Sequence, residues 1–167
     1  NFAFSLVLAG PILLGARTVQ SKFGVGARVV DAVGVPTSSG RLKTFTLQTL
    51  EGPSKIPVTL LRTSLGLRST WFRVGVLALP QPPKPHVFGG TTRLTGTARG
   101  VDGFRMEHLG PTGWRVVATP KPAGDGSFSV VVRPTASAQY RLSLGSARTG
   151  AIRLGVAPQV RLLPVTD

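Results

Sequence analysis

The sequence has no cysteine, two histidines and six acidic residues among its 167 positions. Without cysteine, neither a disulfide nor a thiolate metal site can form. The six carboxylates are Asp31, Glu51, Asp102, Glu107, Asp125 and Asp167. No two of them are placed together by the sequence, so the paired carboxylates of a glycosidase have little support. His86 and His108 lie 22 positions apart without a clustered carboxylate, so we expect no metal or other cofactor.

Motifs for nucleophilic catalysis and phosphate binding are also missing. The chain has no Gly-x-Ser-x-Gly sequence, and no histidine in its first 85 residues could act as the base of a serine nucleophile. Gly24-Val25-Gly26 lacks the other residues of both glycine-rich phosphate-binding motifs, the P-loop and the dinucleotide-binding loop. The residues by themselves therefore indicate no catalytic centre.

Basic residues dominate the charge. Twenty Lys and Arg give a net charge of +14, and fifteen of the twenty are Arg. Residues 1–80 and 81–167 each carry a net +7, so the charge is not confined to a tail. Such a surface indicates an anionic partner, and nucleic acid, an acidic membrane surface and an anionic cell wall all qualify. The alternative is an Arg-rich, Lys-poor composition that serves no partner.

Long hydrophobic runs are absent except near the start. Residues 2–16 are apolar enough for the hydrophobic core of a signal peptide, but no basic segment precedes them, and Gly10-Pro11 interrupts them too early for a membrane span. We expect this stretch to form a strand and a helix of the folded core. A processed targeting segment is the alternative.

With 21 Gly and 14 Pro, the composition favours short strands joined by tight turns. The first 79 residues predict a compact α+β unit of order β-α-β-β-α-β. Its strands are expected at residues 2–9, 27–35, 41–50 and 72–78. One helix should begin at Gly10-Pro11, with Ile12, Ala16, Val19 and Phe23 on one stripe. The other should open at Pro57 and close at Gly66 in a left-handed cap.

Residues 80–85 hold four prolines and predict a stiff linker, which divides the chain into units 1–79 and 86–167. After the linker, apolar residues alternate with polar ones in several short segments separated by turn signals. This pattern predicts an all-β sandwich of the immunoglobulin-like type, so the whole chain should be β-dominated. Tyr140 suggests a tyrosine corner.

The same alternation assigns residues to faces of the sandwich. Trp114, Phe128 and Tyr140 occupy the same inward-facing positions as Val and Leu, so they are expected in the core. Aromatic rings in the core cannot stack on nucleic-acid bases, which disfavours nucleic-acid binding. Five arginines fall opposite the apolar sets and predict a basic outer face: Arg93, Arg115, Arg133, Arg141 and Arg153. The alternative is an ordinary solvated face that discourages edge pairing.

Residues 60–72 show the most distinctive pattern in the sequence. A short helix is expected to be followed by a strand, and the turn between them carries Arg68, Ser69 and Thr70. In a functional reading, this turn holds a glycan or a peptide carboxylate by charge-assisted hydrogen bonds. In a structural reading, which we favour, Ser69 and Thr70 satisfy the polar groups of the turn and Arg68 braces a neighbouring strand.

The run Leu61-Arg62-x-x-Leu65-Gly66-Leu67-Arg68-Ser69-Thr70-Trp71-Phe72, preceded by Gly40-Arg41 and a strand, resembles the C-terminal part of the stage II sporulation protein D family. That family comprises exported peptidoglycan lytic transglycosylases and their amidase-enhancer relatives, and the match covers residues 2–79. The second half resembles, more weakly, the immunoglobulin-like modules of actinobacterial wall proteins, on Asp125-Gly126-Ser127-Phe128-Ser129, Pro134 and Tyr140-Arg141.

The resemblance implies a catalytic glutamate in a segment well before the Leu61 run. Nothing in the chain matches it, since Glu51 is the only glutamate before Leu61 and follows the Gly40-Arg41 strand. We therefore expect a non-catalytic, secreted or envelope-associated module that contacts peptidoglycan or another anionic wall polymer. One alternative is a portion of a lytic transglycosylase whose catalytic domain lies upstream, and another is a structural or assembly subunit. Nucleic-acid binding is an option on charge alone.

Overall fold

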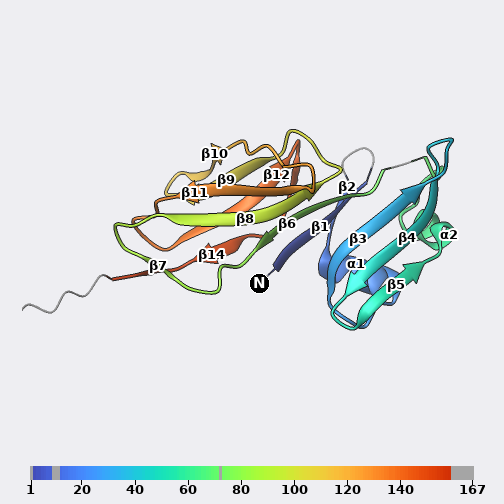
Figure 1. Cartoon of the computed structure of the whole chain (residues 1–167), viewed down its shortest axis with the longest axis horizontal. Coiled ribbons are helices and arrows are strands. Elements are labelled where there is room, and N and C mark those ends of the chain that lie inside the picture. Colours follow the sequence, from blue (N-terminus) through green and yellow to red (C-terminus); the bar gives the residue numbers. More distant parts are fainter. Residues whose placement is uncertain (1, 9–11, 72, 159–167) are drawn as a thin grey trace, which may run out of the picture.

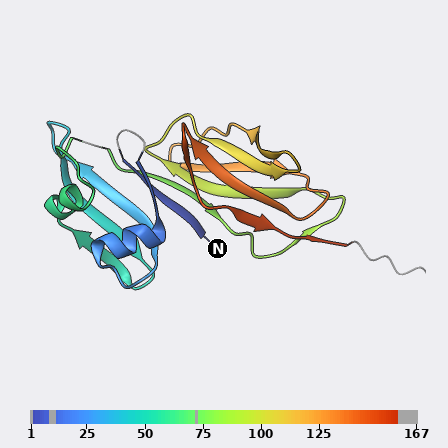
Figure 2. The same cartoon turned by 180° about the vertical axis from the view of Figure 1, so that it is seen from behind.

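A computed structural model describes residues 2–8, 12–71 and 73–158, with side chains from Leu14 onward. The described chain is β-dominated and contains two short helices, as the composition predicted. A β-sandwich occupies one end of the elongated molecule and a small α+β unit the other, with β1 and β6 running between them (Figures 1 and 2).

The elements of the first half are β1 (Phe2–Leu8), β2 (Ile12–Gly15), α1 (Ala16–Phe23), β3 (Val29–Pro36), β4 (Leu42–Thr49), β5 (Gly52–Ile56), α2 (Val58–Ser64) and β6 (Gly75–Pro80). Those of the second half are β7 (His86–Val87), β8 (Thr92–Arg99), β9 (Arg105–Gly110), β10 (Gly113–Ala118), β11 (Ser127–Val132), β12 (Ala138–Leu144), β13 (Ala147–Arg148), β14 (Ile152–Leu154) and β15 (Val156–Ala157).

One antiparallel sheet of order β11-β8-β6-β1-β2 runs through both halves of the chain. Its central strand β6 pairs with β1 on one side and with β8 on the other. The second layer of the sandwich has the order β10-β9-β12-β13, with β14 also paired to β12, and β3-β4-β5 form a separate sheet in the α+β unit. The sheet therefore takes strands from before and after the Pro-rich segment.

Two hydrophobic cores lie on opposite faces of β6. Leu77 and Leu79 join the sandwich core, whereas Val76 and Ala78 join the core of the α+β unit. Because both faces of β6 are covered, its residues 75–79 are all buried. Residues 81–85, which follow β6, form no helix or strand. The proposed division into 1–79, 80–85 and 86–167 stays a prediction.

The α+β unit corrects the expected β-α-β-β-α-β order. The first helix does not begin at Gly10-Pro11, which lie outside the described residues, because Ile12–Gly15 form β2 and α1 starts at Ala16. Residues 52–56, which none of the expected strands includes, form β5. This strand pairs with β4 despite Pro53 because β5 is an edge strand. The helix after Pro57 and the left-handed Gly66 (φ 63°) are confirmed.

The sandwich corrects one aromatic assignment. Phe128 and Tyr140 are buried as expected, but Trp114 is only half-buried and lies against Arg141 on the outer face. A register irregularity between Val116 and Ala118 returns β10 to the core at Ala118, which period-two alternation does not anticipate. The tyrosine-corner suggestion stays a prediction.

Neither described helix is long and apolar enough to cross a membrane. The backbone of the apolar opening stretch pairs along β1 with β2 and β6. The expectation of a strand there is confirmed.

Candidate functional site

The strongest sequence candidate is the turn after α2, and the structure brings it against the start of β4. The left-handed Gly66 turns the chain at the end of α2, and Leu67 N–H donates to the Arg62 carbonyl over 2.9 Å. Farther along, Leu42 N–H donates to the Thr70 carbonyl, also over 2.9 Å. Residues 61–71 and the start of β4, which follows Gly40-Arg41, therefore meet in space.

An arginine–tryptophan pair forms where these segments meet. The guanidinium carbon of Arg41 lies 5.6 Å from the centre of the Trp71 ring, within the range of a cation–π contact. Trp71 is 57% exposed, so most of its indole faces solvent. We use the name turn surface for Arg41, Arg68, Ser69, Thr70 and Trp71.

The remaining turn residues divide between structure and surface. Ser69 Oγ accepts a hydrogen bond from Trp71 N–H at 3.2 Å, as the structural reading predicted for its hydroxyl. Arg68 is exposed and makes no hydrogen bond or ion pair with any described residue, so it braces no strand in this part of the chain. Thr70 contributes its backbone carbonyl. The turn surface thus has a fixed backbone and an arginine free to bind.

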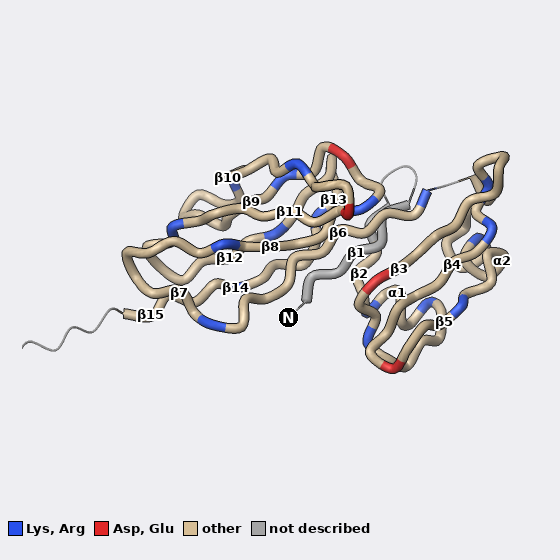
Figure 3. The backbone as a smooth tube through the Cα atoms, in the orientation of Figure 1, with Lys and Arg blue, Asp and Glu red and all other residues tan. Residues whose placement is uncertain are grey.

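The five arginines predicted for a basic outer face do not share one face. Arg93 lies on the outer face of β8, where Nη1 donates to Ser129 Oγ at 3.1 Å. Arg141 and Arg153 lie on the outer side of the other sheet, on strands β12 and β14. Arg115 and Arg133 instead line a cavity at the open side of the sandwich. Figure 3 shows basic residues spread over both ends of the molecule. The expectation of a single basic face is corrected to a dispersed one.

Glu107 is the carboxylate whose role the sequence did not reveal. It lies beside Arg141 on the outer face of its sheet, yet it is only 6% exposed and accepts a 2.7 Å hydrogen bond from Arg141 Nε. Arg148 Nε lies 3.3 Å from its other oxygen. Burial raises the pKa of Glu107, but hydrogen bonds from Arg141 and Ser143 and the charges of Arg148 and Arg141 outweigh burial, so the pKa lies below its ordinary value.

Arg141 also stacks on Trp114, with its guanidinium carbon 4.0 Å from the ring centre. The outer face of this sheet thus carries a small network in which one arginine joins a carboxylate and an indole. Polar residues at every second position of β12, Arg141 among them, indicated the outer face, but only the register with β9 pairs Arg141 with Glu107.

Asp31 links the two ends of the molecule. Arg99 of β8 lies 2.5 Å from its carboxylate and donates to the Ala32 carbonyl at 2.9 Å. The described ion pairs use only Asp31 and Glu107. Several arginines consequently have no carboxylate partner among residues 2–8, 12–71 and 73–158: Arg68, Arg93, Arg115, Arg133 and Arg153.

The histidines lie apart. His86 is buried on β7, with Nδ1 at hydrogen-bond distance from Thr92 Oγ1 and Nε2 without a partner in the described chain. His108 lies on β9 beside Tyr140, with ring centres 5.1 Å apart. The described residues contain no group of three or more side chains suited to a metal ion.

No family model, curated protein or solved structure matches this chain.

Proposed function

We propose that this chain is a basic, non-catalytic module of the cell envelope that contacts peptidoglycan or another anionic wall polymer through its turn surface. The supporting observation is the exposed Trp71 ring with Arg41 over it, beside an unpaired Arg68. The location outside the cell, secreted or envelope-associated, rests on the resemblance to sporulation protein D and is part of the same proposal.

The chemistry of the turn surface suits a polymer that combines sugar rings and acidic groups. The flat indole of Trp71 offers an apolar face with a polar edge, which can lie against a sugar ring. Guanidinium groups bind carboxylate or phosphate through paired, charge-assisted hydrogen bonds. Since Arg68 has no internal partner to give up among the described residues, a bound anion does not have to compete for it.

Catalysis by this chain alone has little support from the described carboxylates. Asp31 pairs with Arg99, Glu107 with Arg141 and Arg148, and Asp125 accepts hydrogen bonds from Ser127. These carboxylates hold the fold together. The alternative that the chain is part of a transglycosylase with its glutamate elsewhere is tested by reading the coding sequence that precedes Asn1, where a glutamate-bearing domain would support it.

Co-sedimentation with purified sacculi tests the binding proposal. We expect the Arg41→Gln/Arg68→Gln variant to bind about tenfold more weakly than the wild type, because each change removes a charge-assisted contact. Trp71→Ala should weaken binding by a similar factor. Arg93→Gln is the matched control, because it removes one exposed arginine far from the turn surface.

Two results would count against the proposal. Equal weakening by Arg93→Gln and by Arg68→Gln would mean that dispersed charge, rather than the turn surface, holds the polymer. Preferential retention by an excess of single-stranded DNA would favour nucleic acid, since indole and arginine also bind bases and phosphates.

A further inference from the structure

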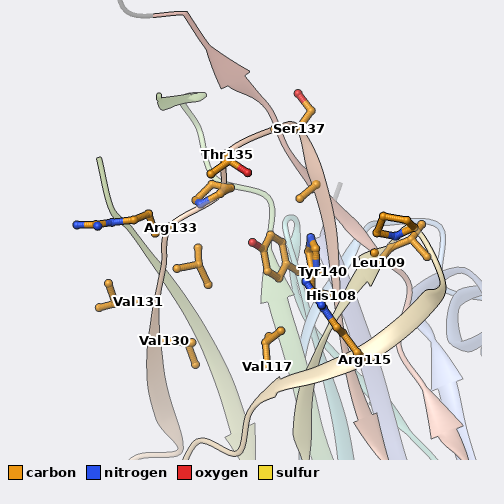
Figure 4. Close-up of a pocket in the computed structure, with 16 residues that line it drawn as sticks. His108, Leu109, Arg115, Val117, Val130, Val131, Arg133, Thr135, Ser137 and Tyr140 are labelled. Carbon is orange, nitrogen blue, oxygen red and sulfur yellow. The ribbon is translucent and has the colours of Figure 1, made fainter. Parts of the chain in front are cut away.

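The sandwich is open along one side, between the edge strand β10 of one sheet and the edge strand β11 of the other. A cavity of about 780 Å³ lies there, lined by residues of β9, β10, β11 and β12 and by the loop from Arg133 to Ser137 (Figure 4). This volume is within the range of small-molecule sites, roughly 300–1,000 Å³. The cavity is separate from the turn surface, which lies in the α+β unit.

Apolar side chains from both sheets form the body of the cavity. Val130 and Val132 come from β11, and Val117 and Leu109 come from β10 and β9. Val117 is 44% exposed and Val130 is only partly buried, because no further strand covers this side of the sandwich. An apolar ligand would remove this surface from water.

Tyr140 supplies an unpartnered hydroxyl inside the cavity. The residue is 4% exposed, and its hydroxyl makes no hydrogen bond with the described residues; the hydroxyl is not fully enclosed, since His86 Nε2 is the fully buried side-chain atom that lacks a partner among them. Its ring projects from β12 into the cavity with the hydroxyl turned toward β11 (Figure 4). Burial raises the pKa of Tyr140, so the phenol stays protonated and can donate a hydrogen bond at neutral pH.

Positive charge surrounds this donor. Arg115 lines the cavity with its side chain over Gly110, and Arg133 lies at the end of β11. Neither arginine has a carboxylate partner among the described residues. His108 is adjacent to Tyr140. Desolvation and the charge of Arg115 lower the pKa of His108, so its imidazole is neutral at pH 7 and adds no charge to the cavity.

We propose that this cavity binds a small amphipathic carboxylate, whose apolar body lies against Val117, Val130 and Val132 and whose carboxylate accepts from Tyr140 and Arg115. An apolar cavity alone would accept any hydrophobic molecule. The hydroxyl donor and the two arginines favour an anion, because the guanidinium groups repel a cationic ligand and form charge-assisted hydrogen bonds only with an anionic one.

Titration of the whole chain with sodium decanoate, below the concentration at which it forms micelles and followed by calorimetry, tests this proposal. We expect saturable one-to-one binding, with decyltrimethylammonium binding at least tenfold more weakly. Arg115→Gln should weaken decanoate binding about tenfold and Tyr140→Phe about fivefold, as expected for the loss of one hydrogen bond to a charged group. Phenylalanine retains the buried ring, and unchanged thermal unfolding verifies that both variants are folded.

Arg93→Gln, on the opposite face of β8, and Trp71→Ala, in the turn surface, are the controls and should bind decanoate like the wild type. Absence of binding, equal binding of decanoate and decyltrimethylammonium, or equal weakening by Arg93→Gln would overturn the proposal. Retention of affinity by Arg115→Gln and Tyr140→Phe together would do the same. None of these results depends on whether the turn surface binds sacculi.

Discussion

At the residue scale, Glu107 shows how a carboxylate in a very basic chain becomes structural. It is held by two arginines and is nearly inaccessible, so its ionised form is stabilised in the folded protein. The sequence could not reveal this role, because the partners Arg141 and Arg148 are 34 and 41 positions away and only the strand register brings them together.

Replacing Glu107 with Gln should lower the free energy of unfolding at pH 7 by about 2 kcal/mol, the order of a hydrogen bond to a charged group. Because the folded-state pKa is below the ordinary value of 4.5, this stabilisation is complete above pH 4.5 and is lost as pH falls through the lowered pKa. Urea unfolding of wild type and variant at pH 7 and pH 3 measures both effects.

The difference in free energy of unfolding between the wild type and Glu107→Gln should therefore be smaller at pH 3 than at pH 7. Glu51→Gln is the control, because Glu51 lies exposed beside the β4–β5 turn, and it should change stability little at either pH. A Glu107→Gln penalty that stays constant from pH 7 to pH 3 would rule out the ionic role.

At the element scale, the sequence predicted strands better than their faces. Periodic segments such as 92–99 and 127–132 formed the expected strands β8 and β11. Strand β5 was missed because Gly52-Pro53-Ser54 has the composition of a turn. The burial of both faces of β6 could not be predicted, because periodicity does not show that two cores cover it. For the candidate site, the motif identified the turn, but only the fold revealed that Arg41 stacks on Trp71.

Gly96 lies in close contact with β6 and with the Phe128 ring of β11. A Cβ there would lie 2.4 Å from the Ala78 carbonyl oxygen and 2.4 Å from the Phe128 ring. We expect Gly96→Ala to cost on the order of 1–3 kcal/mol, since the strands or the ring must shift. The midpoint of chemical denaturation measures the loss.

Gly124→Ala is the matched control, because a Cβ at Gly124 meets nothing within 4 Å. It should leave the midpoint nearly unchanged. If Gly96→Ala were as stable as Gly124→Ala, the close approach of β8 to Ala78 and Phe128 would be wrong.

At the scale of the whole molecule, the shared strand β6 and the Arg99–Asp31 pair tie the sandwich to the α+β unit. A single strand that contributes to two cores couples their stability. The chain should therefore unfold in one cooperative transition.

Truncations on the two faces of β6 test this coupling. Leu77→Ala, in the sandwich core, should cost about 2–5 kcal/mol, and Val76→Ala, in the other core, should cost less because fewer atoms are removed. Calorimetry should show one peak that both variants move to lower temperature. Two peaks, each moved by only one of the variants, would mean that the two ends fold independently.

The net charge of +14, with few internal carboxylate partners, supports the proposal that this molecule contacts a polyanion. The most direct test is the fraction of protein retained on purified sacculi at low and at high salt, for the wild type and for Arg41→Gln/Arg68→Gln. We predict retention of the wild type at low salt, a decrease with added salt and about tenfold weaker binding of the variant. No retention of the wild type at low salt would contradict the proposed function.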